Sequence, residues 1–124
     1  MLDGLGIDMV DVDRIAAMIS KEGGFRELVF SAGEIGYCET KTNKFEHYAA
    51  RFAAKEAFFK ALGTGWADGT AFNEVEITQN ASGKPDLNLL GNTREVLAPL
   101  KIIKILVSLS HIKTMASAVV IIEK

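Results

Sequence analysis

The sequence predicts an α+β fold in which one mostly antiparallel sheet wraps around a long helix. Three observations lead to this prediction. The longest helical pattern in the chain extends from Lys44 to Leu62. An alternating segment, Leu2–Asp8, precedes it, and two segments rich in β-branched residues, Ile102–Ser110 and Met115–Glu123, follow it. Because 124 residues have room for one core, we expect residues 1–124 to form a single domain.

The first strand, Leu2–Asp8, carries two different faces. Its apolar side chains alternate and share one face with the residue that follows: Leu5, Ile7 and Met9. Its other face carries two glycines and an acid: Gly4, Gly6 and Asp8. We expect the glycines to leave open space beside the carboxylate.

The helices have recognisable starts and ends. A helix over Val12–Lys21 ends before Gly23 and Gly24. Ser31 and Glu34 form a possible capping box for a short helix through Thr40. The long helix takes its expected ends from three residues, with Asn43 as the cap, Glu46 three positions later and Gly63 at the close.

The second half alternates loops and short elements. A glycine-rich loop spans residues 63–69, and Trp66 within it is open to two interpretations, packing or a lid. We expect the remaining elements in this order: strand Phe72–Thr78, turn Asn80–Pro85, strand Asp86–Leu90, helix Asn92–Leu100, and the two final strands joined by a turn at His111–Thr114.

Composition excludes several functional classes. A formal charge of −2 argues against a general nucleic-acid or membrane coat, and we expect neither partner. The 48% hydrophobic content and mean hydropathy of +0.16 are high for a small domain, which favours a homo-oligomer that covers apolar surface. The single cysteine, Cys38, excludes an intramolecular disulfide and is most simply a small buried side chain. The absence of a signal-peptide pattern adds to the expectation of a cytoplasmic protein.

Glu56 is out of place on the long helix. The apolar stripe of that helix comprises Phe45, Tyr48, Ala49, Phe52 and Phe59. Glu56 falls in the middle of this stripe, where an unpaired carboxylate is costly. One interpretation is an intrahelical ion pair with Lys60, four residues later. The other is a metal ligand or catalytic acid, with Lys60 facing an anionic ligand.

Asp8 is a second acid on a face that should be apolar or open. An aspartate at a strand end often caps the next helix, so Asp8 alone decides nothing. Together with Glu56 it makes a pair of carboxylates, which is typical of magnesium sites in phosphoryl transfer. Zinc is not expected, because His47 and His111 stand far apart in the sequence and no histidine–cysteine cluster exists.

Four segments resemble the holo-acyl-carrier-protein synthases, the small phosphopantetheinyl transferases. Residues 6–15 are similar to the N-terminal motif of that family, and residues 51–63, RFAAKEAFFKALG, to its signature helix. Residues 83–85 and 107–111 resemble two further motifs, in the family's order. The resemblance spans nearly the whole chain and implies a phosphopantetheinyl transferase-like fold.

The resemblance also implies an activity and a site. The family transfers the phosphopantetheine arm of coenzyme A to a serine of apo acyl carrier protein, in support of fatty acid biosynthesis. Asp8 and Glu56 match its magnesium ligands, and with Lys60 they form the implied catalytic group. The implied coenzyme A contacts are Lys60, Gly63, Gly65, Lys84, Pro85, Ser108, Ser110 and His111. For Ser108, Ser110 and His111, satisfaction of backbone groups at a strand end stays an alternative.

The family is typically a homotrimer with active sites between subunits, and its carrier proteins are acidic around the acceptor serine. On the first helix the residues Arg14, Met18 and Lys21 share one stripe, and Arg26 follows. We expect these four residues to dock the carrier protein, although an ordinary solvated face has the same pattern.

One residue departs from the family pattern. Leu106 stands where many members have a histidine, directly before Val107. Two other functions therefore stay open. One is a coenzyme A or nucleotide-binding module without transfer activity, and the other is an oligomerisation domain without a small ligand.

Overall fold

The computed structural model describes residues 1–65 and 67–124, so Trp66 lies outside the described residues. The elements follow one another in this order: β1 (Leu2–Asp11), α1 (Val12–Ser20), α2 (Phe25–Val29), α3 (Ala32–Glu39), α4 (Lys44–Leu62), the 3₁₀ turn η1 (Phe72–Glu74), β2 (Val75–Gln79), β3 (Pro85–Leu89), α5 (Gly91–Leu97), the 3₁₀ turn η2 (Ala98–Leu100), β4 (Lys104–His111) and β5 (Met115–Glu123). None of the described helices is both long and apolar enough to cross a membrane.

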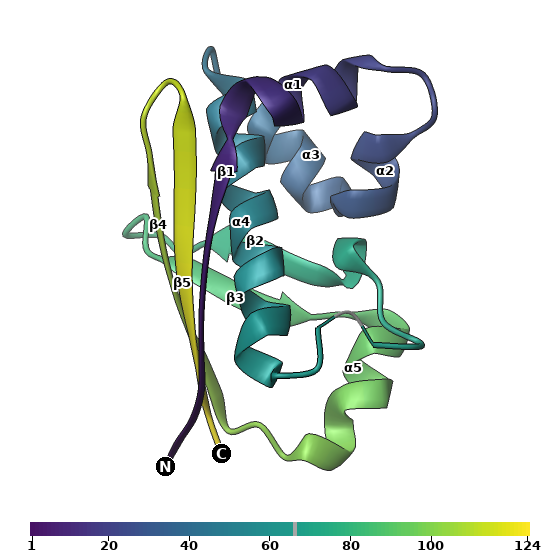
Figure 1. The fold of residues 1–124 in the computed structure, drawn as a ribbon, viewed down its shortest axis with the longest axis vertical. Helices are drawn as coiled ribbons and strands as arrows, with labels where there is room; N and C mark the ends of the chain where they lie inside the picture. Colours follow the sequence, from purple (N-terminus) through teal and green to yellow (C-terminus); the bar gives the residue numbers. More distant parts are fainter. Residues whose placement is uncertain (66) are drawn as a thin grey trace.

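The α+β class is confirmed, and the strands are antiparallel. They divide into two sheets where the sequence predicted one: a three-stranded sheet in the order β1-β5-β4, and the hairpin β2-β3. The two chain ends lie side by side, with the Met1 ammonium donating to the Lys124 carbonyl. Figure 1 shows α4 between the three-stranded sheet, on one side, and the layer of α1, α2 and α3 above the hairpin on the other.

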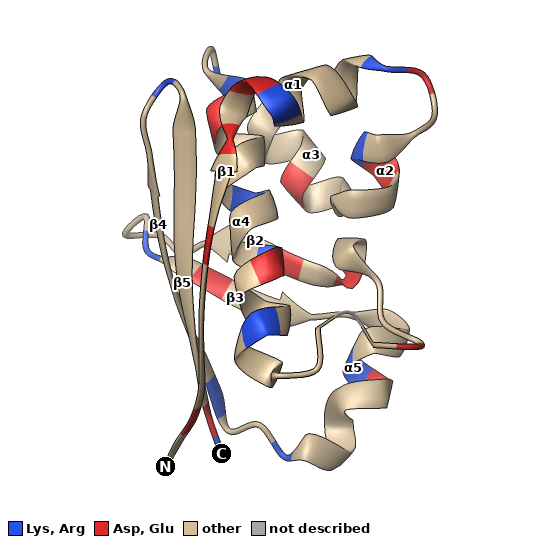
Figure 2. Cartoon of the chain, in the orientation of Figure 1, with Lys and Arg blue, Asp and Glu red and all other residues tan. Residues whose placement is uncertain are grey.

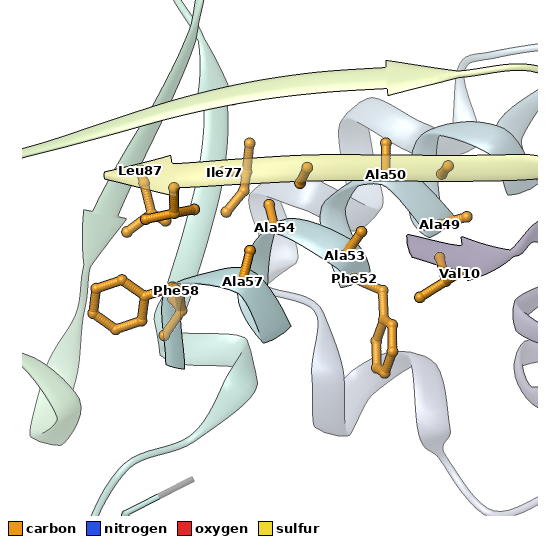
Figure 3. Close-up of a cluster of buried hydrophobic side chains, with 14 of the residues drawn as sticks. Val10, Ala49, Ala50, Phe52, Ala53, Ala54, Ala57, Phe58, Ile77 and Leu87 are labelled. Atoms are coloured by element: carbon orange, nitrogen blue, oxygen red, sulfur yellow. The ribbon is translucent and has the colours of Figure 1, made fainter. Parts of the chain in front are cut away.

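The long helix α4 occupies the centre of the molecule and is buried around most of its circumference. Small side chains make this possible, because they let strands and helices approach from several directions. Figure 3 shows five of them between β5 and the body of the protein: Ala49, Ala50, Ala53, Ala54 and Ala57. The predicted single apolar stripe is therefore too narrow a description of this helix.

The two glycines of β1 lie directly against the backbone of α4. A Cβ atom at Gly6 would be 1.9 Å from the Ala57 carbonyl oxygen, and one at Gly4 would be 2.0 Å from the Ala61 carbonyl oxygen. The expectation of open space on this face is wrong, because the helix backbone fills it. Only glycine permits so close an approach of strand and helix.

The opposite face of the three-stranded sheet is apolar and exposed. Leu5, Ile7 and Met9 on β1 are 69%, 58% and 61% exposed. In the sheet register Leu5 and Leu106 both pair with Ile121, and Ile7 pairs with Val119. A row of apolar side chains therefore crosses all three strands toward solvent, which is unusual for an isolated protein.

Several local predictions can be compared with the structure. The Ser31–Glu34 capping box is confirmed, and Gly63 ends α4 in the left-handed conformation. Asn43 precedes α4 without a side-chain capping bond, and Glu46 instead pairs with His111 Nδ1 at 2.9 Å. The short helix α2 was not predicted. Residues 72–74 form η1, so the strand there begins only at Val75.

Candidate active site

Asp8 reaches α4 from the strand β1. It follows Gly6 by two residues, so its side chain is on the same inner face that contacts the helix. The Lys60 ammonium donates a 2.8 Å hydrogen bond to Asp8 Oδ1 and a 3.1 Å bond to the Ile7 carbonyl oxygen. This hydrogen bond and the Asp8 charge raise the pKa of Lys60.

Glu56 lies beside this pair, one turn before Lys60 on α4. Among the described contacts its carboxylate has neither a hydrogen bond nor an ion pair, so the intrahelical pair with Lys60 is not formed. Partial burial raises the pKa of Glu56, and the neighbouring Asp8 charge raises it further. The positive charges of Lys60 and Arg14 partly oppose this shift, because they lower the pKa of Glu56.

The donor atoms of this site fit a magnesium ion. Two carboxylates stand together, and one is partly buried beside a like charge, so a divalent cation would relieve their repulsion. Within residues 1–65 and 67–124 no third histidine, cysteine or acid completes a cluster of three. Two protein carboxylates leave most coordination positions to water and substrate phosphates, which is the usual arrangement for magnesium.

The other predicted coenzyme A contacts fall in three places. Gly63 and Gly65 lie three and five residues after Lys60, at the end of α4, and both have a positive φ. Lys84 and Pro85 lie at the β2–β3 turn, and Ser108 and Ser110 are exposed on β4. Because the sheet order is β1-β5-β4, Asp8 and the two serines lie on opposite edge strands. One chain therefore carries the two serines on a different strand from Asp8, two strands away across the sheet.

Comparisons with known proteins agree on one family. The model of the 4'-phosphopantetheinyl transferase superfamily matches residues 4–114. A holo-[acyl-carrier-protein] synthase of Cytophaga hutchinsonii is 47% identical, and the match covers 100% of this chain and 99% of the relative. The chain belongs to the 4'-phosphopantetheinyl transferase superfamily.

Solved structures of holo-[acyl-carrier-protein] synthases have the same fold. The enzyme of Neisseria meningitidis matches with a TM-score of 0.91 and 31% identity, over 100% of both chains. The enzyme of Bacillus anthracis, crystallised in complex with CoA (3',5'-ADP), matches with a TM-score of 0.82 and 32% identity, over 100% of this chain and 98% of that one. The family resemblance predicted from the sequence motifs is confirmed.

His111 and Leu106 lie on opposite faces of β4. Leu106 points to the exposed face of β4, whereas a residue five positions later points to the opposite face. There the His111 ring pairs with Glu46 and lies 5.2 Å from the His47 ring, measured between ring centres. These contacts place His111 near the N-terminal half of α4.

Of the four residues expected to dock the carrier protein, Arg14 and Met18 lie on α1, Lys21 directly follows α1, and Arg26 lies on α2. Both helices are at the top of the molecule in Figure 2. Arg14 and Lys21 are exposed, and Met18 lines a groove of about 310 Å³ with Lys21, Phe25 and Leu28. Arg26 differs from the others, because it already pairs with Glu27 at 2.7 Å and with Glu39 at 3.4 Å.

Sequence reasoning missed the partner of Lys55. The Lys55 side chain is fully buried, and its ammonium lies 2.7 Å from Glu34 Oε1. The sequence did contain a signal, because Lys55 lies within a helix that is apolar on most sides. A lysine buried there needs a buried partner for its charge.

The raised pKa of Glu56 leads to a test of the site geometry. In the absence of divalent cations, Asp8→Asn should lower the pKa of Glu56, because it removes a neighbouring negative charge and releases Lys60 from its partner. Titration of the Glu56 carboxyl carbon by NMR measures this shift. Asp3→Asn is the control. Asp3 lies on β1 like Asp8 but pairs with Lys124, so its replacement should leave the pKa of Glu56 unchanged. An unchanged value in Asp8→Asn would mean that the two carboxylates do not interact.

Proposed function

We propose that this protein is a magnesium-dependent holo-acyl-carrier-protein synthase. It transfers the phosphopantetheine arm of coenzyme A to a serine of apo acyl carrier protein, and releases adenosine 3',5'-bisphosphate. The observation that carries the proposal is the meeting of Asp8, Glu56 and Lys60 from β1 and α4. The names of its relatives, and the coenzyme A found with a related structure, support the same substrates.

The reaction joins the serine oxygen to the phosphorus that bears pantetheine and breaks the bond from that phosphorus to the pyrophosphate bridging oxygen. Negative charge then grows on the departing bisphosphate. Lys60, whose side chain is 54% exposed, is long enough to turn from Asp8 toward these oxygens and stabilise their charge. A magnesium ion held by Asp8 and Glu56 supplies further charge stabilisation when it is bound.

The serine proton needs an acceptor, and Glu56 is the nearest candidate at the site. Its carboxylate has no hydrogen-bond or ion-pair partner among the described residues, so its oxygens are available to accept a proton. Phosphoryl transfer depends mainly on positioning and charge stabilisation. The proposal therefore expects an active enzyme although Leu106 replaces the imidazole found in many family members.

The assembly forms part of the proposal. The exposed apolar face of the three-stranded sheet supports a homo-oligomer of single-domain subunits, and the family resemblance favours a trimer. The predicted coenzyme A contacts are spread over α4 and its following loop, the β2–β3 turn and the edge strand β4, and this supports active sites between subunits, where β1 and α4 of one copy meet β4 and the β2–β3 turn of the next. We place the reaction in the cytoplasm, with which a single cysteine thiol is compatible.

Transfer is tested by incubating the protein with apo carrier protein, coenzyme A and magnesium, and weighing the carrier by mass spectrometry. We expect the mass of the phosphopantetheine arm to appear. Asp8→Asn and Glu56→Gln should each lower turnover about 100-fold or more, and the double variant should add little, because residues that act as one unit are not additive. Wild-type turnover by Glu56→Gln at limiting magnesium would refute its role as ligand and base.

We propose further that the acidic carrier protein docks on the exposed cations of α1. Arg14→Ala with Lys21→Ala should raise the KM for carrier protein about tenfold and leave the KM for coenzyme A unchanged, with a weaker effect at high salt. Arg94→Ala with Lys101→Ala is the matched control, since it removes two cations beside the groove between β3 and α5. Equal effects on both substrates would contradict docking at α1. Arg26→Ala should have a smaller effect because two carboxylates already hold it.

A further inference from the structure

Lys55 and Glu34 form an ion pair in the centre of the protein. Both side chains are 0% exposed, and Lys55 Nζ lies 2.7 Å from Glu34 Oε1. Burial lowers the pKa of Lys55, and the adjacent Glu34 charge opposes this shift. Buried ion pairs generally contribute little stability compared with apolar side chains of the same volume. The pair therefore calls for an explanation other than stability.

The pair connects four elements of the fold. The Lys55 ammonium uses all three of its donors, because it also donates to the carbonyl oxygens of Phe72 at 2.9 Å and Val75 at 2.5 Å. Glu34 accepts from the backbone amides of Ser31 and Ile77, both at 2.9 Å. This network of five hydrogen bonds ties α4 to α3, η1 and β2 at one point.

The position of the pair controls the rotation of α4. Glu56 follows Lys55 directly, so its side chain leaves the helix about 100° further round. On the side facing β1, the glycine backbone lies against the carbonyls of Ala57 and Ala61. The helix is thus held from two directions, and Glu56 is aimed at Asp8 as a consequence. The charges that act on Glu56 come from Asp8, Lys60 and Arg14, so the connection to Lys55 is geometric.

We propose that Lys55 is a positioning residue, which acts through Glu34, Phe72 and Val75 to fix the rotation of α4 that brings Glu56 within reach of Asp8. The inference rests on the proposed function, since it assigns Lys55 to the carboxylate pair that would hold magnesium. It extends the site to a residue that touches neither substrate nor metal.

The test uses the double variant Glu34→Gln with Lys55→Met, which removes both charges and keeps similar volumes. We expect it to fold, because no buried charge is left unpaired, but with a lower Tm, because the carbonyl oxygens of Phe72 and Val75 lose their donor. Its affinity for magnesium, titrated calorimetrically in the presence of coenzyme A, should fall about tenfold or more, as for other residues that orient metal ligands. In the transfer assay kcat should fall, and the KM for carrier protein should stay unchanged.

Leu97→Ala is the matched control, because it opens a cavity beneath α5 and lowers the Tm without touching the pair. It should retain wild-type magnesium affinity. A folded double variant with wild-type affinity and kcat would overturn the proposal. If the double variant does not fold, Glu34→Gln with Lys55→Gln, which also leaves no buried charge and keeps a donor toward the two carbonyls, takes its place with the same expectations for magnesium affinity and kcat. Absence of transfer by the wild-type protein would refute the proposed function alone, since magnesium affinity is measured without transfer.

Discussion

The contact between the β1 glycines and the backbone of α4 is the constraint on which the rest of the structure depends. At Gly4 and Gly6 the strand and the helix carbonyls are so close that any side chain would collide with them. Forcing a methyl group into such a contact typically costs about 1–3 kcal/mol. This approach places Asp8 over the helix turn that carries Glu56 and Lys60, so two segments about fifty residues apart in the chain share one site.

Charge is distributed in this protein according to burial. In the fully buried ion pair, every donor of Lys55 is satisfied, and Glu34 accepts from backbone amides on both oxygens. The partly exposed acids Asp8 and Glu56 share a single nearby lysine, so their negative charges are incompletely balanced within the chain. The satisfied pair of Lys55 and Glu34 thus supports the incompletely balanced carboxylates of Asp8 and Glu56. A site for a cation and a phosphate substrate requires such a rigid support.

Local sequence signals predicted local structure well, and non-local contacts escaped them. The Ser31–Glu34 box and the Gly63 helix end depend only on neighbouring residues, and both were predictable. The two faces of β1 were divided correctly, but the expectation of open space beside its glycines was wrong. Leu5, Ile7 and Met9 look like a core face, yet an exposed apolar sheet has the same pattern as a buried one. The family motifs predicted that Asp8, Glu56 and Lys60 belong to one site. That Lys60 pairs with Asp8 and not with Glu56 could be seen only in the fold.

The central claim is that close packing of β1 on α4 sets the geometry of Asp8 and Glu56, the carboxylates proposed to bind magnesium. Calorimetric titration of magnesium into Gly6→Ala, with coenzyme A present, tests it most directly, because both carboxylates are retained. Gly36→Ala is the control, since a Cβ atom there meets nothing within 4 Å. We predict that Gly6→Ala remains folded by circular dichroism and loses about tenfold or more in magnesium affinity, while Gly36→Ala binds like the wild type. Wild-type affinity in folded Gly6→Ala would contradict the claim.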